Sequence, residues 1–279
     1  RLMRFRRGYR GALVVTMHDV FDRVGLRERY LQPDVWSLRW LGRTADRIVV
    51  HSQIEVERLR GIIPVEKMRV IPHFVEQREL SLTPEEARTR LGIGERKLVT
   101  LLGFVYGRKG HRYAVEAVPY LPDDTMMVYA GGPVEGRTFV HDLALQKAEE
   151  LGLGDRFRIT GYLEEDELET WIAATHLAIL PFTDLSASGS MSSWISAGKP
   201  MLASDLPGTR EYARWAPGAL HFFGPAEPWP LGSAITELLS GPLPDPDPGV
   251  QQLARELSME NTVDRYLEVA REAFVSRAG

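Results

Sequence analysis

The sequence predicts an α/β protein built on parallel sheets that are covered by helices on both faces. Short β-branched, apolar runs alternate with helical patterns along almost the whole chain. Runs such as residues 98–102 are nearly continuously apolar, which is typical of parallel strands buried on both faces. The regular helices between the strands exclude a β-sandwich and indicate doubly wound domains.

The pattern places each element. We expect strands at residues 13–17, 47–51, 68–71, 98–102, 126–129, 157–160, 177–180 and 200–203. We expect helices at residues 53–59, 112–118, 138–151, 165–174, 188–197 and 261–277. Another helix should start at Thr83, because Pro84 can occupy a first turn and the next two residues are acidic.

The strand–helix rhythm stops between residues 72 and 94, where the chain is polar and charged. We therefore expect residues 1–76 to form an N-terminal Rossmann-like domain, and residues 77–260 a second, complete one. The first holds about three strands, so we expect it to be incomplete. Residues 261–279 form the last expected segment, a helix that crosses back to the first domain.

Composition narrows the possible partners. A chain of 279 residues with net charge −4 gives no reason to expect nucleic acid. The absence of cysteine excludes disulfides and thiolate metal sites. No apolar run approaches the ~20 residues that span a bilayer.

Five of the first ten residues are arginine, interleaved with apolar residues, and two structures fit them. One is a basic amphipathic helix on an anionic membrane; the other is a solvated helix packed on its own domain.

Three loops that follow predicted strands have chemistry suited to a ligand. Residues 103–110 combine glycines with Arg108 and Lys109 before a helix, which suits a phosphate but also an ordinary turn. Residues 186–193 are rich in serine at a helix start, which makes either an anion site or a helix cap. Residues 160–163 end a strand at Gly161 and lead to an acidic helix start.

Taken in order, these segments resemble the donor domain of retaining GT-B glycosyltransferases of family four. The matching blocks are residues 98–110, 129–133, 161–163, 180–182 and 188–200. Upstream, residues 14–19, 45–52 and 70–73 resemble the latter half of that family's acceptor domain. The resemblance implies a GT-B fold of two doubly wound Rossmann-like domains, the first one incomplete at its N-terminus.

The resemblance also implies roles for the donor side. Lys109 falls where the family places a lysine on the donor diphosphate, and Tyr106 or Arg108 stands near its partner arginine. The other residues expected at the diphosphate are Gly103, Ser188, Gly189, Ser190 and Met191. The residues expected at the nucleobase and ribose are Gly161, Tyr162, Leu163 and Ser193.

On the acceptor side, His18 occupies the position of the family's active-site histidine, followed by Asp19 as in many members. The alternative for His18 is a histidine that caps a strand end. Two family glutamates are replaced here by Leu185 and Ser193, and Asp184 could take the place of the first only with a one-residue shift. Since a serine cannot accept two charged hydrogen bonds, worth roughly 1.5–3 kcal/mol each, we expect weaker donor binding.

These observations predict transfer of a sugar from a nucleoside-diphosphate sugar, based on UDP or GDP, to a glycan, lipid or small-molecule acceptor. The anomeric configuration is expected to be retained, with no metal and no cofactor. We expect a cytoplasmic protein, with the arginine-rich start as a membrane contact at the inner face. Two alternatives stay open: a non-catalytic homologue that acts as a scaffold, and a nucleotide-sugar epimerase.

Overall fold

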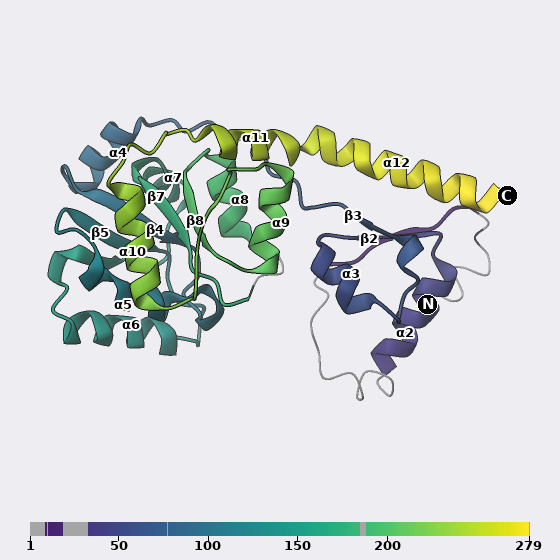
Figure 1. Cartoon of the computed structure of the whole chain (residues 1–279), viewed down its shortest axis with the longest axis horizontal. Helices are drawn as coiled ribbons and strands as arrows, with labels where there is room; N and C mark the ends of the chain where they lie inside the picture. The colour runs from purple at the N-terminus through teal and green to yellow at the C-terminus, as the bar shows by residue number, and fades with distance from the viewer. Residues whose placement is uncertain (1–8, 10, 19–32, 77, 185–187, 279) are drawn as a thin grey trace. The chain divides into compact units, whose positions relative to one another are not determined.

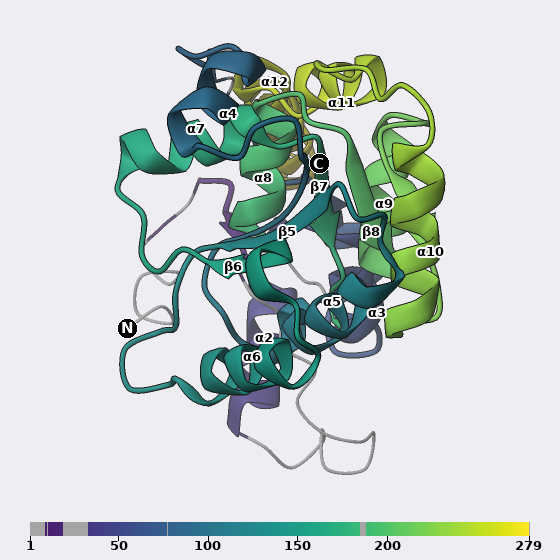
Figure 2. The same cartoon turned by 90° about the vertical axis from the view of Figure 1, so that its left-hand side faces the viewer.

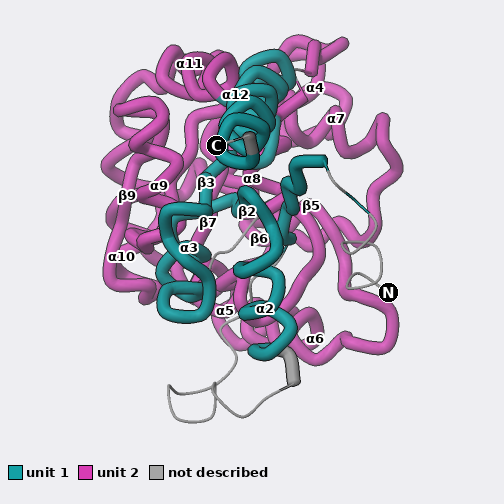
Figure 3. The backbone as a smooth tube through the Cα atoms, turned by 90° about the vertical axis from the view of Figure 1, so that its right-hand side faces the viewer, with its two compact units in different colours: residues 1–74, 257–279 teal, residues 75–256 magenta. Residues whose placement is uncertain are grey.

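The chain folds into two compact units in the computed structural model, which describes residues 9, 11–18, 33–76, 78–184 and 188–278. Unit 1 comprises Arg1–Phe74 and Leu257–Gly279, and unit 2 comprises Val75–Glu256 (Figure 3). The sequence placed the corresponding divisions after residues 76 and 260.

Unit 2 is organised around a six-stranded parallel sheet with strand order β6-β5-β4-β7-β8-β9. The strands are β4 (Lys97–Leu102), β5 (Thr125–Ala130), β6 (Phe157–Ile159), β7 (Leu177–Leu180), β8 (Met201–Ser204) and β9 (His221–Phe223). All residues of β5, β7 and β8 are buried, as expected for strands covered on both faces. The order is that of a doubly wound Rossmann-like sheet.

Helices cover both faces of this sheet (Figures 1 and 2). Helices α5 (His111–Ala117), α6 (Phe139–Glu150) and α10 (Pro228–Leu239) pack together on one face. On the other lie α4 (Pro84–Leu91), α7 (Glu165–Ala174), α8 (Gly189–Ser196), α9 (Pro207–Trp215) and α11 (Pro248–Glu256). One hydrophobic core forms between the sheet and the first set, where Val99, Leu101 and Met127 meet Val115 and Ile235.

Unit 1 holds a three-stranded parallel sheet in the order β1-β2-β3. Its strands are β1 (Val14–Thr16), β2 (Arg47–Val50) and β3 (Met68–Val70), and the α-helices among its described residues are α2 (Pro33–Thr44), α3 (Gln53–Leu59) and α12 (Met259–Ala278). Side chains alternate across β2: Ile48 and Val50 pack with Leu59 of α3, whereas Val49 packs with Val269 of α12.

The C-terminal helix α12 is fastened to the unit 1 sheet by ion pairs. Glu272 contacts Arg47 of β2 at 3.0 Å and Arg69 of β3 at 2.6 Å. The hydroxyl of Thr16 also lies 3.4 Å from that of Tyr266. Because this carboxylate is partly exposed, the pairs fix the position of α12 more than they stabilise it.

The structure confirms the α/β fold class, and each of the eight predicted strands is present within a residue or two of its expected ends. The predicted cap of α4 is also present: Thr83 and Glu86 form a reciprocal capping box. Strand β9 and helices α2, α9, α10 and α11 were not predicted. Across the described residues, no helix combines the length and the apolar character needed to cross a bilayer.

Candidate functional site

In the parallel sheet of unit 2, the chain adds strands outward in one direction from β4 and in the opposite direction from β7, so the topological switch point lies between β4 and β7. Doubly wound sheets bind their ligands at such a point, beyond the carboxyl ends of the strands. A cavity of about 390 Å³ lies there. We call it the switch-point cavity. It is lined by Leu102, Gly103, Phe104, Tyr106, Lys109, Ala130, Gly131, Gly132, Tyr162, Leu163, Leu168, Ser188, Gly189, Ser190 and Ser193.

Two of the glycines that line this cavity lie against neighbouring backbone or side-chain atoms. A Cβ on Gly131, which has φ +150°, would lie 2.2 Å from the carbonyl oxygen of Gly103. A Cβ on Gly103, with φ +99°, would lie 2.5 Å from Nζ of Lys109. Gly131 therefore requires glycine for both its backbone conformation and its space, whereas Gly103 is constrained mainly by its positive φ, since the lysine end can move.

Lys109 places a buried cation at the cavity. Only 8% of the residue is exposed, and its Nζ donates to the carbonyl of Leu102 at 2.7 Å and to Oγ of Ser190 at 3.2 Å. Burial lowers the pKa of Lys109 to about 8. None of the described residues that line the cavity is acidic. A buried ammonium with neutral partners is poorly compensated, so the site favours an anionic ligand.

The N-terminus of α8 adds a second source of positive potential. Ser188 caps this helix by accepting from the backbone N–H of Met191 at 3.3 Å, and Oγ of Ser188 lies 3.0 Å from that of Ser190. The first N–H groups of a helix and its dipole both favour an anion. Ser190 joins the two features, since its hydroxyl also accepts from Lys109.

The loop that carries Lys109 is fixed by hydrogen bonds and by close packing against the loop after β7. Burial lowers the pKa of His111 to about 3, so its ring is neutral, and its Nδ1 donates to the carbonyl of Tyr106 at 3.1 Å. Gly110 has φ +75°, and a Cβ there would lie 1.8 Å from the carbonyl oxygen of Pro181, just after β7. The backbone N–H of Thr183 donates to the carbonyl of Arg108 at 3.0 Å. The loops after β4 and β7 therefore form one packed layer.

Aromatic side chains supply the other character of the cavity. Three aromatic residues line the cavity and are open to solvent: Phe104, Tyr106 and Tyr162, of which Tyr162 is 73% exposed. Exposed aromatic faces of this kind suit stacking on a planar ring. One cavity thus offers anion-binding groups and flat apolar surfaces together.

The structure gathers nine of the predicted site residues around the cavity. They are Gly103, Tyr106, Lys109, Tyr162, Leu163, Ser188, Gly189, Ser190 and Ser193. Four others do not line it. Arg108 and Asp184 are exposed and pair with each other at 3.5 Å. Met191 is a buried residue of α8, and Gly161 directly precedes the lining residues Tyr162 and Leu163.

Three predictions fall outside the described residues: Asp19, Leu185 and the arginine-rich start of the chain. Sequence reasoning did not single out Phe104, Gly131 or Gly132 as lining residues. The signal for the glycines was present, since they directly follow the buried strand β5.

Ser193 stands where the resemblance places a ribose-binding glutamate. Its hydroxyl donates to the carbonyl of Gly189 at 3.1 Å, one turn earlier in α8. The hydroxyl oxygen can still accept one hydrogen bond from a ligand, but it has no negative charge to offer.

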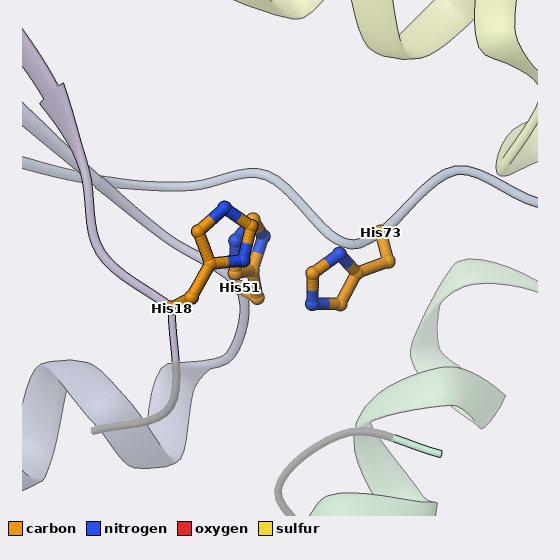
Figure 4. Close-up of side chains that lie close together, drawn as sticks. All are labelled: His18, His51 and His73. Atoms are coloured by element: carbon orange, nitrogen blue, oxygen red, sulfur yellow. The ribbon is translucent and has the colours of Figure 1, made fainter. Parts of the chain in front are cut away.

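His18 lies in unit 1, just beyond β1. Its ring neighbours those of His51, which follows β2, and His73, which lies beyond β3 (Figure 4). No metal ligands were predicted from the sequence, in which these three histidines are far apart.

Comparison with known proteins then identifies the family. The profile described as "Glycosyl transferases group 1" matches residues 95–240, a range that contains the whole switch-point cavity. The chain belongs to this family. Residues 2–79 match a second profile, described as "Glycosyltransferase Family 4".

Two curated relatives are similar to this chain along much of its length. The chain is 27% identical over 210 residues to 2-deoxystreptamine glucosyltransferase of Streptomyces kanamyceticus. The aligned region covers 70% of this chain and 53% of the relative. The chain is 25% identical to D-inositol 3-phosphate glycosyltransferase of Thermobispora bispora, over 94% of this chain and 65% of the relative. The chain thus spans only 53% and 65% of their lengths.

Solved structures show the same fold. HepE of Anabaena, crystallised in complex with UDP, superposes with a TM-score of 0.77 at 16% identity, over 93% of this chain and 72% of its own. Sucrose-phosphate synthase of Thermosynechococcus elongatus gives 0.75 at 18% identity, over 98% and 71%. The fold of this chain is therefore GT-B, as the resemblance implied.

Proposed function

We propose that the protein transfers a sugar from a nucleoside-diphosphate sugar to an acceptor, with retention of the anomeric configuration. The observation that carries this proposal is the buried cation Lys109, beside the N-terminus of α8, in a cavity whose described lining has no carboxylate. Membership of the glycosyl transferases group 1 family supports the same reaction class.

In the proposed reaction, the diphosphate of the donor lies against Lys109 and the first N–H groups of α8. As the bond between the anomeric carbon and the diphosphate breaks, negative charge grows on the leaving oxygen. Fixed positive groups that already face this position stabilise that charge without rearranging. The leaving group is thus stabilised by side chain and backbone alone, and we propose that this step needs no metal.

The base and ribose of the donor would occupy the aromatic side of the cavity, near Tyr162 and Leu163. UDP is the first candidate, since HepE was crystallised with UDP and, separately, with UDP and glucose. Because Ser193 offers one neutral acceptor, we expect the ribose to be held less tightly than a carboxylate would hold it.

On the acceptor side, we propose that His18 orients the transferred sugar, with Asp19 beside it in sequence. The acceptor is a glycan, a lipid or a small molecule. The arginine-rich start remains our candidate for contact with an anionic membrane.

Thermal unfolding with UDP-, GDP-, ADP- and TDP-sugars tests the proposal. One of these donors at 100 times its dissociation constant should stabilise the protein by about 2.7 kcal/mol. The same donor should give a smaller shift with a variant that lacks the Lys109 charge. If no donor raises the melting temperature, the scaffold alternative becomes the better account.

The affinity for the diphosphate should depend on pH through Lys109. Its pKa of about 8 in the ligand-free protein means that the ammonium is mostly charged at pH 7 and mostly neutral at pH 9. An anion binds the charged form, so the dissociation constant of UDP should rise about tenfold between pH 7 and pH 9.

Calorimetry across this range measures the effect, and the Lys109→Met variant should show no comparable rise in the dissociation constant.

The stability of the ligand-free protein should increase, and not decrease, over the same rise in pH. Since the unfolded chain retains its proton to higher pH than the folded one, Lys109 makes the ligand-free protein more stable as pH rises above about 8. A pH-independent dissociation constant for the wild type would contradict the role of Lys109.

A further inference from the structure

Three histidines meet at the carboxyl edge of the unit 1 sheet, each supplied by a different strand. His18 lies just beyond β1, His51 directly follows β2, and His73 lies beyond β3. Because β1, β2 and β3 are neighbouring parallel strands, their carboxyl ends share one edge, and the three rings lie side by side there (Figure 4). One ring nitrogen of each residue lies within 4.8 Å of the other two.

The hydrogen bonds of His51 leave one nitrogen ready to bind a cation. Its Nδ1 lies 2.9 Å from the carbonyl oxygen of Ile71, which can only accept, so Nδ1 carries the proton. In the neutral ring Nε2 then carries the lone pair, and this atom is buried without a hydrogen-bond partner. A histidine that donates one N–H to a backbone carbonyl and presents its other nitrogen is the usual arrangement of a metal ligand.

The backbone of His51 is also fixed in place. Ser52 caps α3 in a reciprocal capping box with Glu55. The buried carboxylate of Glu55 accepts from the backbone N–H of His51 at 2.7 Å and from that of Ser52 at 3.1 Å. The position of this ring is therefore set by the start of α3 before any ligand binds.

The other two residues allow an ion to enter. His18 is exposed, so its ring is open to solvent, and His73 is half-buried. The rings of His51 and His73 are stacked with centroids 3.8 Å apart. Bond lengths of about 2.0–2.1 Å to one ion would bring the nitrogens within ~3.5 Å of each other, so the rings must turn their edges inward. Because His51 is fixed, this rotation has to be made by the exposed His18 and the half-buried His73.

We infer that His18, His51 and His73 form a binding site for a divalent transition-metal ion, of which Zn²⁺ is the representative. Three imidazoles and no thiolate suit Zn²⁺, Ni²⁺ or Cu²⁺ and do not suit the hard ions Mg²⁺ or Ca²⁺, which prefer oxygen. Three protein ligands leave a fourth tetrahedral position for water or another ligand. The site shares His18 with the proposed sugar transfer, but that transfer needs no ion at the leaving group, and binding of an ion here can be measured without it.

Titration of metal-free full-length protein with Zn²⁺ tests the site, with Co²⁺ as a spectroscopic probe. We expect one Zn²⁺ per chain by calorimetry and a visible d–d absorption of Co²⁺ that Zn²⁺ abolishes. Mg²⁺ should give neither signal. Zn²⁺ should also raise the melting temperature, because it binds only the folded arrangement.

Three variants locate the ion. His18→Ala removes an exposed ring, so its fold should be unaffected. His51→Asn keeps an N–H that can reach the carbonyl of Ile71, and His73→Asn removes the third ring. Each should weaken Zn²⁺ binding at least tenfold and reduce the Co²⁺ absorption. The matched control, His221→Asn on β9 of unit 2, should bind as the wild type does. Wild-type affinity in the three variants, or no Zn²⁺ bound by the wild type, would overturn the inference.

Discussion

Replacing Gly110 with alanine is expected to destabilise unit 2 by roughly 2–5 kcal/mol and to abolish nucleotide binding. Two costs add at this position. An L-residue at φ +75° costs about 1–2 kcal/mol, and the new Cβ would lie 1.8 Å from the carbonyl oxygen of Pro181. Relieving such an overlap costs about 1–3 kcal/mol more. It also separates the loops after β4 and β7, which moves Lys109 away from Ser190.

Gly107 provides the matched control within the same loop. Nothing lies within 4 Å of a Cβ built there, and its φ is not in the left-handed region. Thermal unfolding should show Gly110→Ala melting on the order of 10 °C lower, with Gly107→Ala close to the wild type. Equal melting temperatures for the two variants would contradict the packed layer that we describe beneath the cavity.

Replacing Lys109 with methionine should weaken the binding of UDP at least tenfold while leaving the fold intact. The substitution removes the ammonium and keeps a flexible side chain of similar length. Tenfold corresponds to about 1.4 kcal/mol, a modest value for one charge-assisted hydrogen bond to a diphosphate. Since burial disfavours the charged form of Lys109, losing the charge should not lower the melting temperature.

The control for net charge is Arg112→Met, an exposed arginine in α5 that pairs with Glu116 and does not line the cavity. Calorimetry should give this variant a dissociation constant for UDP close to that of the wild type. If Lys109→Met bound UDP as tightly as Arg112→Met does, the diphosphate would have to lie elsewhere.

The fold was largely predictable because buried parallel strands have a distinctive sequence. Strand β7 is an uninterrupted apolar run and β4 and β5 are nearly so, and this pattern does not depend on partners far along the chain. Strand β9 has only three residues, two of them partly exposed, and its place depends on pairing with β8. Helix α10 begins with Pro-Trp-Pro at residues 228–230, which the sequence pattern presents as a loop.

The loops that form the candidate site could be predicted from the sequence, but which residues of different loops contact each other could not. Lys109 and Ser190 are 81 residues apart in sequence, and only the strand order that places β4 beside β7 brings them into hydrogen-bond distance. The exposed pair of Arg108 and Asp184 could not be foreseen from the loop sequence, since it depends on that same juxtaposition.

The histidine cluster shows a second limit of sequence reasoning. In the sequence, His51 ends one predicted strand and His73 follows another, and nothing in the sequence shows that these strand ends are neighbours. Their significance depends on the order β1-β2-β3, which aligns three strand ends on one edge. It depends also on the carbonyl of Ile71, which determines the tautomer of His51.

The most direct test of the central claim is an experimental structure of the protein with UDP bound. We predict that the diphosphate lies in the switch-point cavity, within hydrogen-bond distance of Nζ of Lys109 and of the first N–H groups of α8. The base should lie on the side of Tyr162 and Leu163. A nucleotide bound anywhere else, or a diphosphate that does not contact Lys109, would contradict the account.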